Sequence, residues 1–432
     1  MRADGGQIFN LDSQQSLALN KTGFLIATLL LQGREPKDIV REVQRKYRGA
    51  RRRLVESDID GVIKLLDDFV RQEKVETPSD YRLRRYAGEQ PLQMPLSIYW
   101  EVTLNCNLRC LHCYTASGSR HPQELNTPEC LALIREWGAG GVCEVIIGGG
   151  EPFTRPDMVQ LIDAIQQAEI TVICVSNGTL LTTDLVGRLS DAGLSYLAVS
   201  LDGHTPELHN QFRGTDFAFD KAVEGIQNLK KAGFTVTLQT VVTQLNKHAL
   251  EAIADLAWNL GASSWDVKAF NIVNRAAIHR HLALRPEDVA EIASRLQAIG
   301  TQYEGRMGVD TTYPMTFTLN REFKQTQKPS RRLACGPGFE TAGLTADGRL
   351  LTCSFIRHHD WISKSVREES FTRLWQTSPI FDPFRNLTTA HLTCCKNCSL
   401  LFEECWGGCR ARAFASTGDF FARDPLCQLR MT

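Results

Sequence analysis

The sequence predicts an α/β protein built around a partial (β/α)6, TIM-like barrel, with a winged-helix-like α+β domain before the barrel and a cysteine-rich domain after it. Three observations lead to this fold class. β-rich and helical segments alternate six times between residues 96 and 310, a hairpin and three helices are expected within residues 1–80, and eight of the 14 cysteines lie beyond residue 334. We therefore expect domains at 1–80, 96–310 and 311–432, with a linker at 81–95.

The composition is that of a globular protein and argues against several functions. The chain has 432 residues, in which 49 Lys and Arg balance 49 Asp and Glu. A net charge of zero argues against a nucleic-acid binder held by bulk electrostatic attraction. No apolar run reaches the roughly 18 residues of a membrane span, and residues 1–10 lack the basic and apolar pattern of a signal peptide. We expect a cytoplasmic protein with no nucleic-acid partner and no membrane partner.

The first domain is predicted from turn, cap and periodicity signals. Two short β-rich runs and three helical segments follow one another at 7–11, 16–19, 23–31, 36–47 and 56–73. Apolar residues recur at helical spacing in the second and third helices, so they indicate a core and not a site. The stretch 34–53 carries nine basic residues against three acidic ones. A solvated face and the docking of an acidic peptide both explain this charge better than DNA binding does, because the whole chain is neutral.

The barrel is predicted from six apolar strands separated by helical segments. The strands are expected at 97–103, 142–147, 171–176, 196–200, 235–242 and 264–270. Strands this apolar indicate a parallel sheet covered by helices. In such folds the chemistry lies at the carboxyl ends of the strands, and the first group of cysteines directly follows the first strand.

The cysteines need a use other than disulfides, because a cytosolic compartment keeps thiols reduced. Three of them stand alone in apolar or helical surroundings and are interpreted as small buried hydrophobes, namely Cys130, Cys143 and Cys174. Cys106, Cys110 and Cys113 lie close together, as thiolates must when they converge on a metal centre. A structural zinc site takes four ligands, whereas this loop offers three cysteines. A four-iron four-sulfur cluster held by three thiolates has one iron open to a substrate or cofactor.

The segment Cys106-Asn-Leu-Arg-Cys110-Leu-His-Cys113 resembles the CxxxCxxC loop of the radical S-adenosylmethionine (SAM) superfamily. Further motifs of that family follow in order at predicted strand ends. These are Gly148-Gly149-Gly150-Glu151-Pro152, which resembles the GGEP motif, then Ser176-Asn177-Gly178, then Ser200-Leu201-Asp202-Gly203, with His209 and Arg213 further on. The resemblance covers roughly residues 96–300, and four motifs in the family order are far more specific than one glycine-rich turn.

This resemblance implies a site for radical chemistry. Cys106, Cys110 and Cys113 are the implied catalytic residues, as ligands of a 4Fe–4S cluster whose open iron binds SAM; one electron passed to the sulfonium yields a 5′-deoxyadenosyl radical. The residues implied in binding SAM are Tyr114, Gly149, Gly150, Glu151, Pro152, Ser176, Asn177, Ser200, Asp202 and Arg213. For Tyr114, an adenine contact and simple packing explain the residue equally well.

The C-terminal cysteines resemble the SPASM extension of peptide-modifying radical SAM enzymes. Cys335 is followed by 12 residues, Gly348, four residues and Cys353, and the later cysteines follow at Cys395, Cys398, Cys405, Cys409 and Cys427. Six residues separate Cys398 from Cys405, where the family has five, a difference that a loop absorbs. The resemblance implies two auxiliary clusters and so three 4Fe–4S clusters in all, one held by Cys395, Cys398, Cys405 and Cys427 and the other by Cys335, Cys353 and Cys409. The second has three cysteines, so a non-cysteine group, Cys394 or the substrate completes it.

The first domain resembles the PqqD-like peptide-binding module of pyrroloquinoline quinone biosynthesis, also called the RiPP recognition element. The resemblance is in the segments 19–24, 33–40 and 58–75. It implies that the leader of a ribosomally made precursor peptide adds a strand to the hairpin and lies against the third helix. We expect a basic face near Arg41, Arg45 and Arg48 to match acidic residues of such a leader. The implied enzyme is a maturase of a ribosomally synthesised and post-translationally modified peptide (RiPP). It is expected to take electrons from a flavodoxin or ferredoxin-type donor.

Two other functions stay open at this point. The tail from Gly407 to Cys427 also resembles radical SAM enzymes of haem and haem d1 biosynthesis, although a porphyrin substrate does not need the first domain. A non-catalytic iron-sulfur protein that binds peptides or regulates is the alternative from another class, and the full set of SAM motifs argues against it.

Overall fold

The computed structural model describes residues 5–10, 15–31, 33–46, 52–70, 91–310, 335–398, 401, 405 and 407–427. The chain forms two compact units, Met1–Tyr86 and Ala87–Thr432. Most of the expected linker at 81–95, the expected end of the third helix at 71–73 and Arg48 lie outside the described residues.

The N-terminal unit consists of an antiparallel hairpin and three helices. The hairpin pairs β1 (Gly5–Asn10) with β2 (Gln15–Asn20), and α1 (Lys21–Leu31), α2 (Pro36–Lys46) and α3 (Arg52–Val70) follow. Its core contains side chains from all three helices, among them Ile26, Ile39, Val43, Ile59 and Val62. The third helix begins four residues earlier than the periodicity predicts, where an ion pair between Arg52 and Glu56 adds an i,i+4 contact to its first turn.

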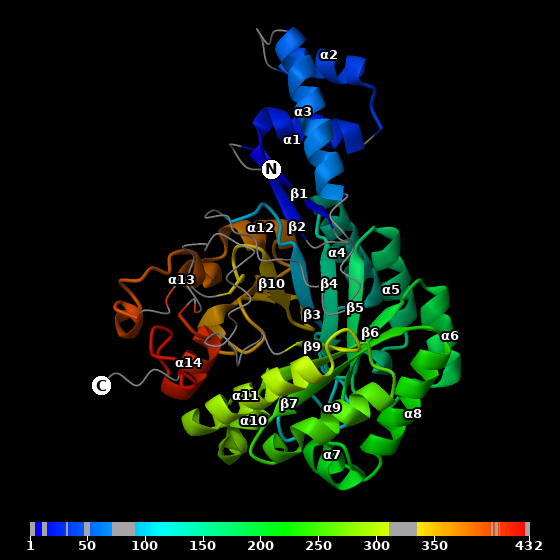
Figure 1. The fold of residues 1–432 in the computed structure, drawn as a ribbon, viewed down its shortest axis with the longest axis vertical. Coiled ribbons are helices and arrows are strands. Elements are labelled where there is room, and N and C mark those ends of the chain that lie inside the picture. Colours follow the sequence, from blue (N-terminus) through cyan, green and yellow to red (C-terminus); the bar gives the residue numbers. More distant parts are fainter. Residues whose placement is uncertain are drawn as a thin grey trace. The chain divides into compact units, whose positions relative to one another are not determined.

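The second unit is organised by one ten-stranded sheet (Figure 1). Its central parallel strands are β3 (Ser97–Thr103), β4 (Glu144–Gly149), β5 (Thr171–Ser176), β6 (Tyr196–Ser200), β7 (Thr235–Val242) and β8 (Ser264–Ala269). Four of the six predicted strands have the predicted bounds. β4 begins and ends two residues later than expected, because the strand continues into the first glycines of the Gly148–Gly150 turn.

The sheet is larger than the six predicted strands. β9 (Gly308–Asp310) pairs with β8 at one edge. Beyond β3 lie β10 (Thr341–Leu344), β11 (Arg349–Leu351) and β12 (Ile362–Ser365), and β10 runs parallel to β3. Among the described residues the two edge strands, β9 and β12, do not pair, so the sheet is open. The cysteine-rich C-terminal segment therefore continues the same sheet that carries the first cysteine loop.

Helices connect the strands of this unit, and several of them cover the outer face of the sheet. They are α4 (Thr127–Gly140), α5 (Met158–Gln167), α6 (Thr183–Asp191), α7 (Pro206–Arg213), α8 (Ala218–Lys231), α9 (Leu250–Asn259), α10 (Arg275–Ile278) and α11 (Pro286–Gln302). Figure 1 shows α5, α6 and α8 along the outside of the sheet. Trp100, Trp137 and Trp265 are fully buried in the core between strands and helices. None of the described helices is long and apolar enough to cross a membrane.

The C-terminal segment adds α12 (Phe371–Thr377), α13 (Asp382–Arg385) and α14 (Arg410–Thr417). α12 packs its Phe371 and Trp375 into the main core. A separate small core surrounds Cys409 with aromatic and aliphatic side chains, among them Ile356, Phe384 and Phe420. Cys335 and Cys353 pack at its border, so three distant cysteines meet in one apolar cluster.

Candidate active site

The first cysteines lie on a loop that leaves the carboxyl end of β3, where the fold predicts the chemistry. We call residues 106–113 the thiol loop. Backbone hydrogen bonds hold it on both sides: Leu111 N donates to Phe212 O at 2.9 Å, and Gly118 N donates to Leu104 O at 2.8 Å. The loop is therefore anchored to the end of α7 and to its own return segment.

The guanidinium groups of Arg109 and Arg275 donate hydrogen bonds to carbonyls in the thiol loop and just after it. Arg109 donates to the carbonyls of Cys106 and Leu108 at 2.8 and 2.9 Å. Arg275, at the start of α10, donates to Ser117 O at 2.6 Å and also to the carbonyls of Ala116 and Cys110. These carbonyls lie outside helices and strands, so they have no partner in regular secondary structure. Each guanidinium donates to several of them and thereby fixes the conformation of the loop.

The thiols of the loop lie in partly buried surroundings. Burial raises the pKa of Cys106 to about 11, and Glu151, Cys110 and Cys113 raise it further. Burial also raises the pKa of Cys110, against the nearby Arg213, whose Nη1 lies 3.8 Å from the Cys110 sulfur. At neutral pH these two thiols are protonated, so any metal that binds here must displace their protons.

The Gly148–Gly150 turn packs directly on the backbone that leads into the thiol loop. Gly149 has φ +106°, and a Cβ there would press on Thr103 O, while a Cβ at Gly150 would overlap Asn105 O. Gly150 N donates to Thr103 O at 2.7 Å. The glycines are thus needed because this turn contacts the chain's own backbone. This reason is additional to the SAM contact that the resemblance implies for Gly149 and Gly150.

Glu151 links the glycine turn to the end of β5. Its carboxylate is fully buried and accepts hydrogen bonds from Ser176 Oγ at 2.9 Å and from Asn177 N at 2.8 Å. Burial raises the pKa of Glu151 to about 7, although these hydrogen bonds lower it. Asn177 Nδ2 in turn donates to Asn107 Oδ1 of the thiol loop at 2.9 Å. The structure therefore brings Glu151, Ser176 and Asn177 together beside the loop, and Pro152 follows at the start of a short buried turn.

Asp202, just after β6, is the centre of a second buried group. Its Oδ2 lies 2.6 Å from Arg213 Nη2 and 3.5 Å from His112 Nε2. Burial would raise the pKa of Asp202, but Arg213 and His112 hold it below its ordinary value. Burial lowers the pKa of His112 to about 4, so this imidazole is neutral at pH 7. Ser200 is the last residue of β6 and lies two residues before this group.

Tyr114 lies between the thiol loop and the C-terminal segment. Its hydroxyl contacts the hydroxyl of Tyr99, and its ring packs against Phe355 with centroids 4.8 Å apart. The guanidinium of Arg357 lies 5.7 Å from the same ring. Contacts within the protein therefore cover much of the surface of the Tyr114 side chain.

The C-terminal cysteines fall into two groups in space. Cys353 interacts electrostatically with Cys335 and Cys409, and we call these three the Cys353 set. The Cys395 set consists of Cys395, Cys398, Cys405 and Cys427, in which Cys405 interacts with the other three. The Cys394 sulfur lies 3.6 Å from that of Cys395 and so belongs beside the second set. The structure thus brings the cysteines of each expected ligand group near one another, and their role as cluster ligands stays a prediction.

The spacing of the thiols bears on the kind of group they can hold. Among the described residues, His358, His359 and Asp360 form the one group of three potential ligands whose ligand atoms all lie within 4.8 Å of one another. Four sulfurs around one zinc ion lie about 3.8 Å apart, because Zn–S bonds are about 2.3 Å long in a tetrahedron. Within the described part of the chain, no three thiols of the loop or of either set lie within 4.8 Å of one another.

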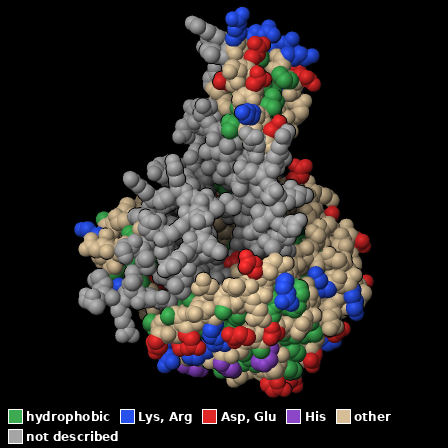
Figure 2. Space-filling model, viewed as in Figure 1, with side chains coloured by type: hydrophobic (Ala, Val, Ile, Leu, Met, Phe, Trp, Pro, Cys, Tyr) green, Lys and Arg blue, Asp and Glu red, His purple; other side chains and the backbone are tan. Residues whose placement is uncertain are grey.

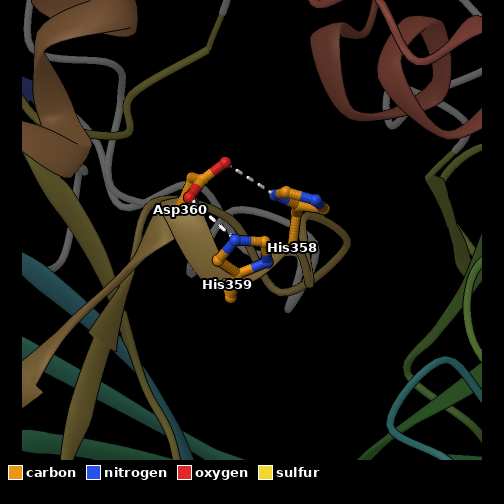
Figure 3. Close-up of side chains that lie close together, drawn as sticks. All are labelled: His358, His359 and Asp360. Carbon is orange, nitrogen blue, oxygen red and sulfur yellow. Dashed lines mark ion pairs between the residues drawn. The ribbon is translucent and has the colours of Figure 1, made fainter.

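The compact group of His358, His359 and Asp360 lies at the surface (Figure 3). Figure 3 shows the Asp360 carboxylate beside the two imidazoles, with one oxygen toward each ring. The distances are 3.2 Å to His358 Nδ1 and 3.0 Å to His359 Nε2. His359 and Asp360 are 81% and 67% exposed, so water competes for each of these contacts.

Comparison with known proteins identifies the family. Residues 100–257 match the radical SAM superfamily, and residues 335–399 match the SPASM iron-sulfur cluster-binding domain. An AdoMet-dependent heme synthase from Methanosarcina barkeri is 31% identical over 352 residues, which cover 78% of this chain and 97% of that protein. This chain belongs to the radical SAM superfamily. It is an enzyme, and its two domains indicate SAM and iron-sulfur clusters as cofactors.

Other proteins similar to this radical SAM enzyme are not described as heme synthases. Mycofactocin maturase MftC from Mycobacterium tuberculosis is 30% identical over 341 residues, which cover 78% of this chain and 84% of that protein. Streptococcus suis SuiB bound to SAM has the same fold, with a TM-score of 0.71 and 17% identity over 98% of this chain and 97% of that chain. The membership of this chain in an enzyme family overturns the non-catalytic alternative.

The residues of the site fit the cofactors of this radical SAM family. Three thiols offer soft ligands for iron and no fourth cysteine lies in their loop. His112 Nδ1, His209 Nε2 and Arg213 Nε are buried and have no hydrogen-bond partner among the described residues. Polar atoms left in this state are costly unless a ligand or water satisfies them.

Sequence reasoning missed several residues that shape the radical SAM site. Arg109 lies inside the motif itself, and its charge is the only sequence signal for its role. Arg275, Tyr99, Glu101 and Arg357 contact the site from other elements. No local pattern marks them, because their partners are distant in the chain.

Proposed function

We propose that this radical SAM enzyme reductively cleaves SAM and modifies a ribosomally synthesised precursor peptide, whose leader binds to the N-terminal unit. The product carries a thioether, a carbon–carbon crosslink or a related change begun by hydrogen abstraction. The observation that carries the peptide assignment is the hairpin-and-helix unit that accompanies the SAM and SPASM domains in one chain.

The N-terminal unit offers a site for an added strand. Among the described residues, β1 and β2 pair only with each other, so each has an unpaired edge. An extended peptide can pair with such an edge through its main chain. The SuiB match spans 98% of this chain, and one SuiB structure with a TM-score of 0.70 is described as bound to its precursor peptide SuiA. This likeness supports a precursor peptide as partner.

A basic surface on the same unit supports an acidic leader. Figure 2 shows blue Lys and Arg side chains gathered at the tip of the N-terminal unit, over α2. Arg41 and Arg45 are 77% and 76% exposed. Their ion pairs with Asp38 and Glu42 are exposed as well and so leave the guanidiniums available to a partner.

In the proposed reaction the protein positions charge and excludes water. Cys106, Cys110 and Cys113 would hold a cluster that, when bound, would supply the single electron for reductive cleavage of SAM. We propose that the remaining SAM contacts come from the residues that the motifs mark: Tyr114, Gly149, Gly150, Glu151, Pro152, Ser176, Asn177, Ser200, Asp202 and Arg213. The paired Asp202 and Arg213 place a fixed dipole next to Cys110. Burial of these groups shields a radical from solvent.

The proposal includes three clusters, with the Cys353 set and the Cys395 set as auxiliary sites. Replacing Cys106, Cys110 and Cys113 together by Ala is expected to abolish SAM cleavage and to remove about one third of the bound iron, since the other two sites keep theirs. Deoxyadenosine formed with dithionite and SAM, and iron content, measure the two effects. Cys143→Ala is the matched control, and undiminished deoxyadenosine in the triple variant would refute the assignment.

Peptide binding is tested with the full-length holoenzyme. Calorimetry against peptides encoded by short reading frames beside the gene is expected to detect binding to the full chain and none to a chain that lacks residues 1–86. A porphyrin that binds the full chain, with no neighbouring peptide bound, is the outcome that contradicts the peptide proposal.

Tetrapyrrole modification is the second candidate, and the heme synthase relative favours it. That protein is covered over 97% of its length at 31% identity. If this function is correct, the anaerobic holoenzyme converts an iron porphyrin in the presence of SAM, and removal of residues 1–86 leaves the conversion unchanged.

A further inference from the structure

A largely buried ion pair, in which Arg357 is 14% and Glu101 1% exposed, joins the sheet beneath the thiol loop to the segment that carries Cys353. Glu101 lies on β3 and is 1% exposed. Its two carboxylate oxygens accept from both terminal nitrogens of Arg357, with Nη1 at 2.9 Å from Oε2. Arg357 Nε donates to Ser354 O at 2.7 Å. The guanidinium therefore closes residues 353–357, which we call the Cys353 segment, and ties that segment to β3.

The same guanidinium also contacts the residue that follows the thiol loop. Tyr114, next to Cys113, packs its ring against Phe355 and lies under Arg357. Its hydroxyl contacts Tyr99, which lies two residues before Glu101 and so points to the same face of β3. Tyr114 is thus held from one side by the sheet and from the other by the Cys353 segment. Any displacement of Arg357 moves both the ring beside Cys113 and the turn beside Cys353.

The charges of this pair are arranged asymmetrically. Arg357 lies in the Cys353 segment and donates to Ser354 O, one residue after Cys353. Glu101 lies on β3, on the other side of the guanidinium. The positive end of the pair therefore belongs to the Cys353 segment, and the negative end belongs to the sheet.

Packing alone does not explain a pair of this kind. Taking two charges out of water costs several kcal/mol, and apolar side chains of similar volume often stabilise a core as well or better. The exposed pair of Arg367 and Glu129 joins the C-terminal segment to α4 without this cost, at 2.6 and 2.8 Å. A buried charge next to Cys353 is better explained by its effect on what the cysteines hold.

We propose that Arg357, held by Glu101, is a positioning residue that fixes the Cys353 segment against the thiol loop and sets the reduction potential of the group bound by the Cys353 set. The inference rests on the proposed function, because it requires an iron-sulfur cluster at that set. A positive charge near a cluster stabilises its reduced, more negative form. The Arg357 charge raises the potential, and Glu101 limits the rise.

Opposite charge changes are therefore expected to move the potential in opposite directions. Glu101→Gln leaves the guanidinium unbalanced, so the potential becomes more positive. Arg357→Met removes the positive end, so the potential becomes more negative whether or not Glu101 then takes up a proton. Arg357→Lys keeps the charge and is expected to stay close to the wild type in potential, with a weaker hold on Tyr114 because an ammonium lacks the planar fork.

The experiment uses the full chain, reconstituted anaerobically with iron and sulfide. Redox titration followed by electron paramagnetic resonance reports the potential of the signal that Cys353→Ala removes. The same samples are given SAM and dithionite without substrate, and deoxyadenosine measures cleavage that is not coupled to product. Arg367→Met is the matched control, since it breaks the exposed pair with Glu129 elsewhere in the C-terminal segment.

Opposite shifts in Glu101→Gln and Arg357→Met, with Arg357→Lys and Arg367→Met near the wild type, support the inference. Shifts in the same direction, or none in variants that carry full iron, overturn it while the cluster assignment stands. If Arg357→Met does not fold, the sign of the shift in Glu101→Gln decides. If Cys353→Ala loses neither signal nor iron, the auxiliary-cluster proposal itself fails, and the inference fails with it.

Discussion

At the scale of single residues, charged side chains do as much as the cysteines to shape this site. Arg109 and Arg275 donate hydrogen bonds to carbonyls of the thiol loop and of the residues that follow it. Arg213 lies against Cys110, and Arg357 lies near Cys353. Each is a permanent cation in a place where thiolates are expected. Such cations favour deprotonation and metal binding, in opposition to the burial that keeps the free thiols protonated.

The buried carboxyl of Glu151 gives a residue-scale prediction about pH. Burial raises its pKa to about 7 from an ordinary value of 4.5. The native state then holds a proton that the unfolded chain releases, so the free energy of unfolding falls as pH rises from about 4.5 to 7 and stays lower above that window. Relative to Glu151→Gln, the wild type is expected to lose about 1 to 3 kcal/mol between pH 5 and pH 8.

Anaerobic urea unfolding of the two proteins across this range measures the effect of Glu151. The exposed Glu169→Gln serves as the control and is expected to follow the wild type. A difference between wild type and Glu151→Gln that is the same at pH 5 and pH 8 would show that Glu151 does not hold a proton in the native state.

At the scale of elements, regular local signals explain which parts of the fold are predictable. Buried parallel strands are continuous apolar runs, so β3, β5, β6 and β7 have the predicted bounds. β10 to β12 have three or four residues each, and pairing with β3 and with one another defines them as strands. Their existence depends on contacts between distant segments, which no local pattern in this sequence marks.

The cap of α4 gives a prediction at this scale. Asn126 Oδ1 accepts from Glu129 N at 3.0 Å, and Glu129 Oε2 accepts from Asn126 N at 2.8 Å, which forms a capping box. Asn126→Ala is expected to lower the free energy of unfolding by about 1 kcal/mol. Asn126→Asp keeps an acceptor at the helix N-terminus and is expected to stay within about 0.5 kcal/mol of the wild type. Urea denaturation compares them, and equal losses in both variants would contradict the capping role.

At the scale of the whole molecule, the candidate site is only partly readable from sequence. The cysteines and the GGEP segment are local motifs, and the structure brings Glu151, Ser176 and Asn177 together where the motifs place them. The contacts of Arg275 with Ser117 and of Arg357 with Glu101 join residues more than a hundred positions apart. Only the three-dimensional course of the sheet brings such pairs together.

The continuous sheet predicts that the second unit folds as one piece. Removing residues 311–432 leaves β3 without its β10 partner and uncovers a long apolar edge. We expect this truncated chain to aggregate or lose fixed tertiary packing. Removing residues 1–86 takes away no strand of the ten-stranded sheet, so that chain is expected to stay folded and free of aggregation. Light scattering with size exclusion, and near-UV circular dichroism, distinguish the two; a folded monomer of residues 1–310 would contradict the prediction.

The parallel pairing of β10 with β3 also sets an order of events during synthesis. Ser97 leaves the ribosome long before its partner Thr341, and at about 5 to 20 residues per second the interval is roughly 10 to 50 seconds. During that interval the edge of β3 that later pairs with β10 remains unpaired. Cys427 of the Cys395 set leaves the ribosome later still. The nascent chain is therefore most prone to aggregation while it is being made, before its C-terminal cysteines are available to bind iron.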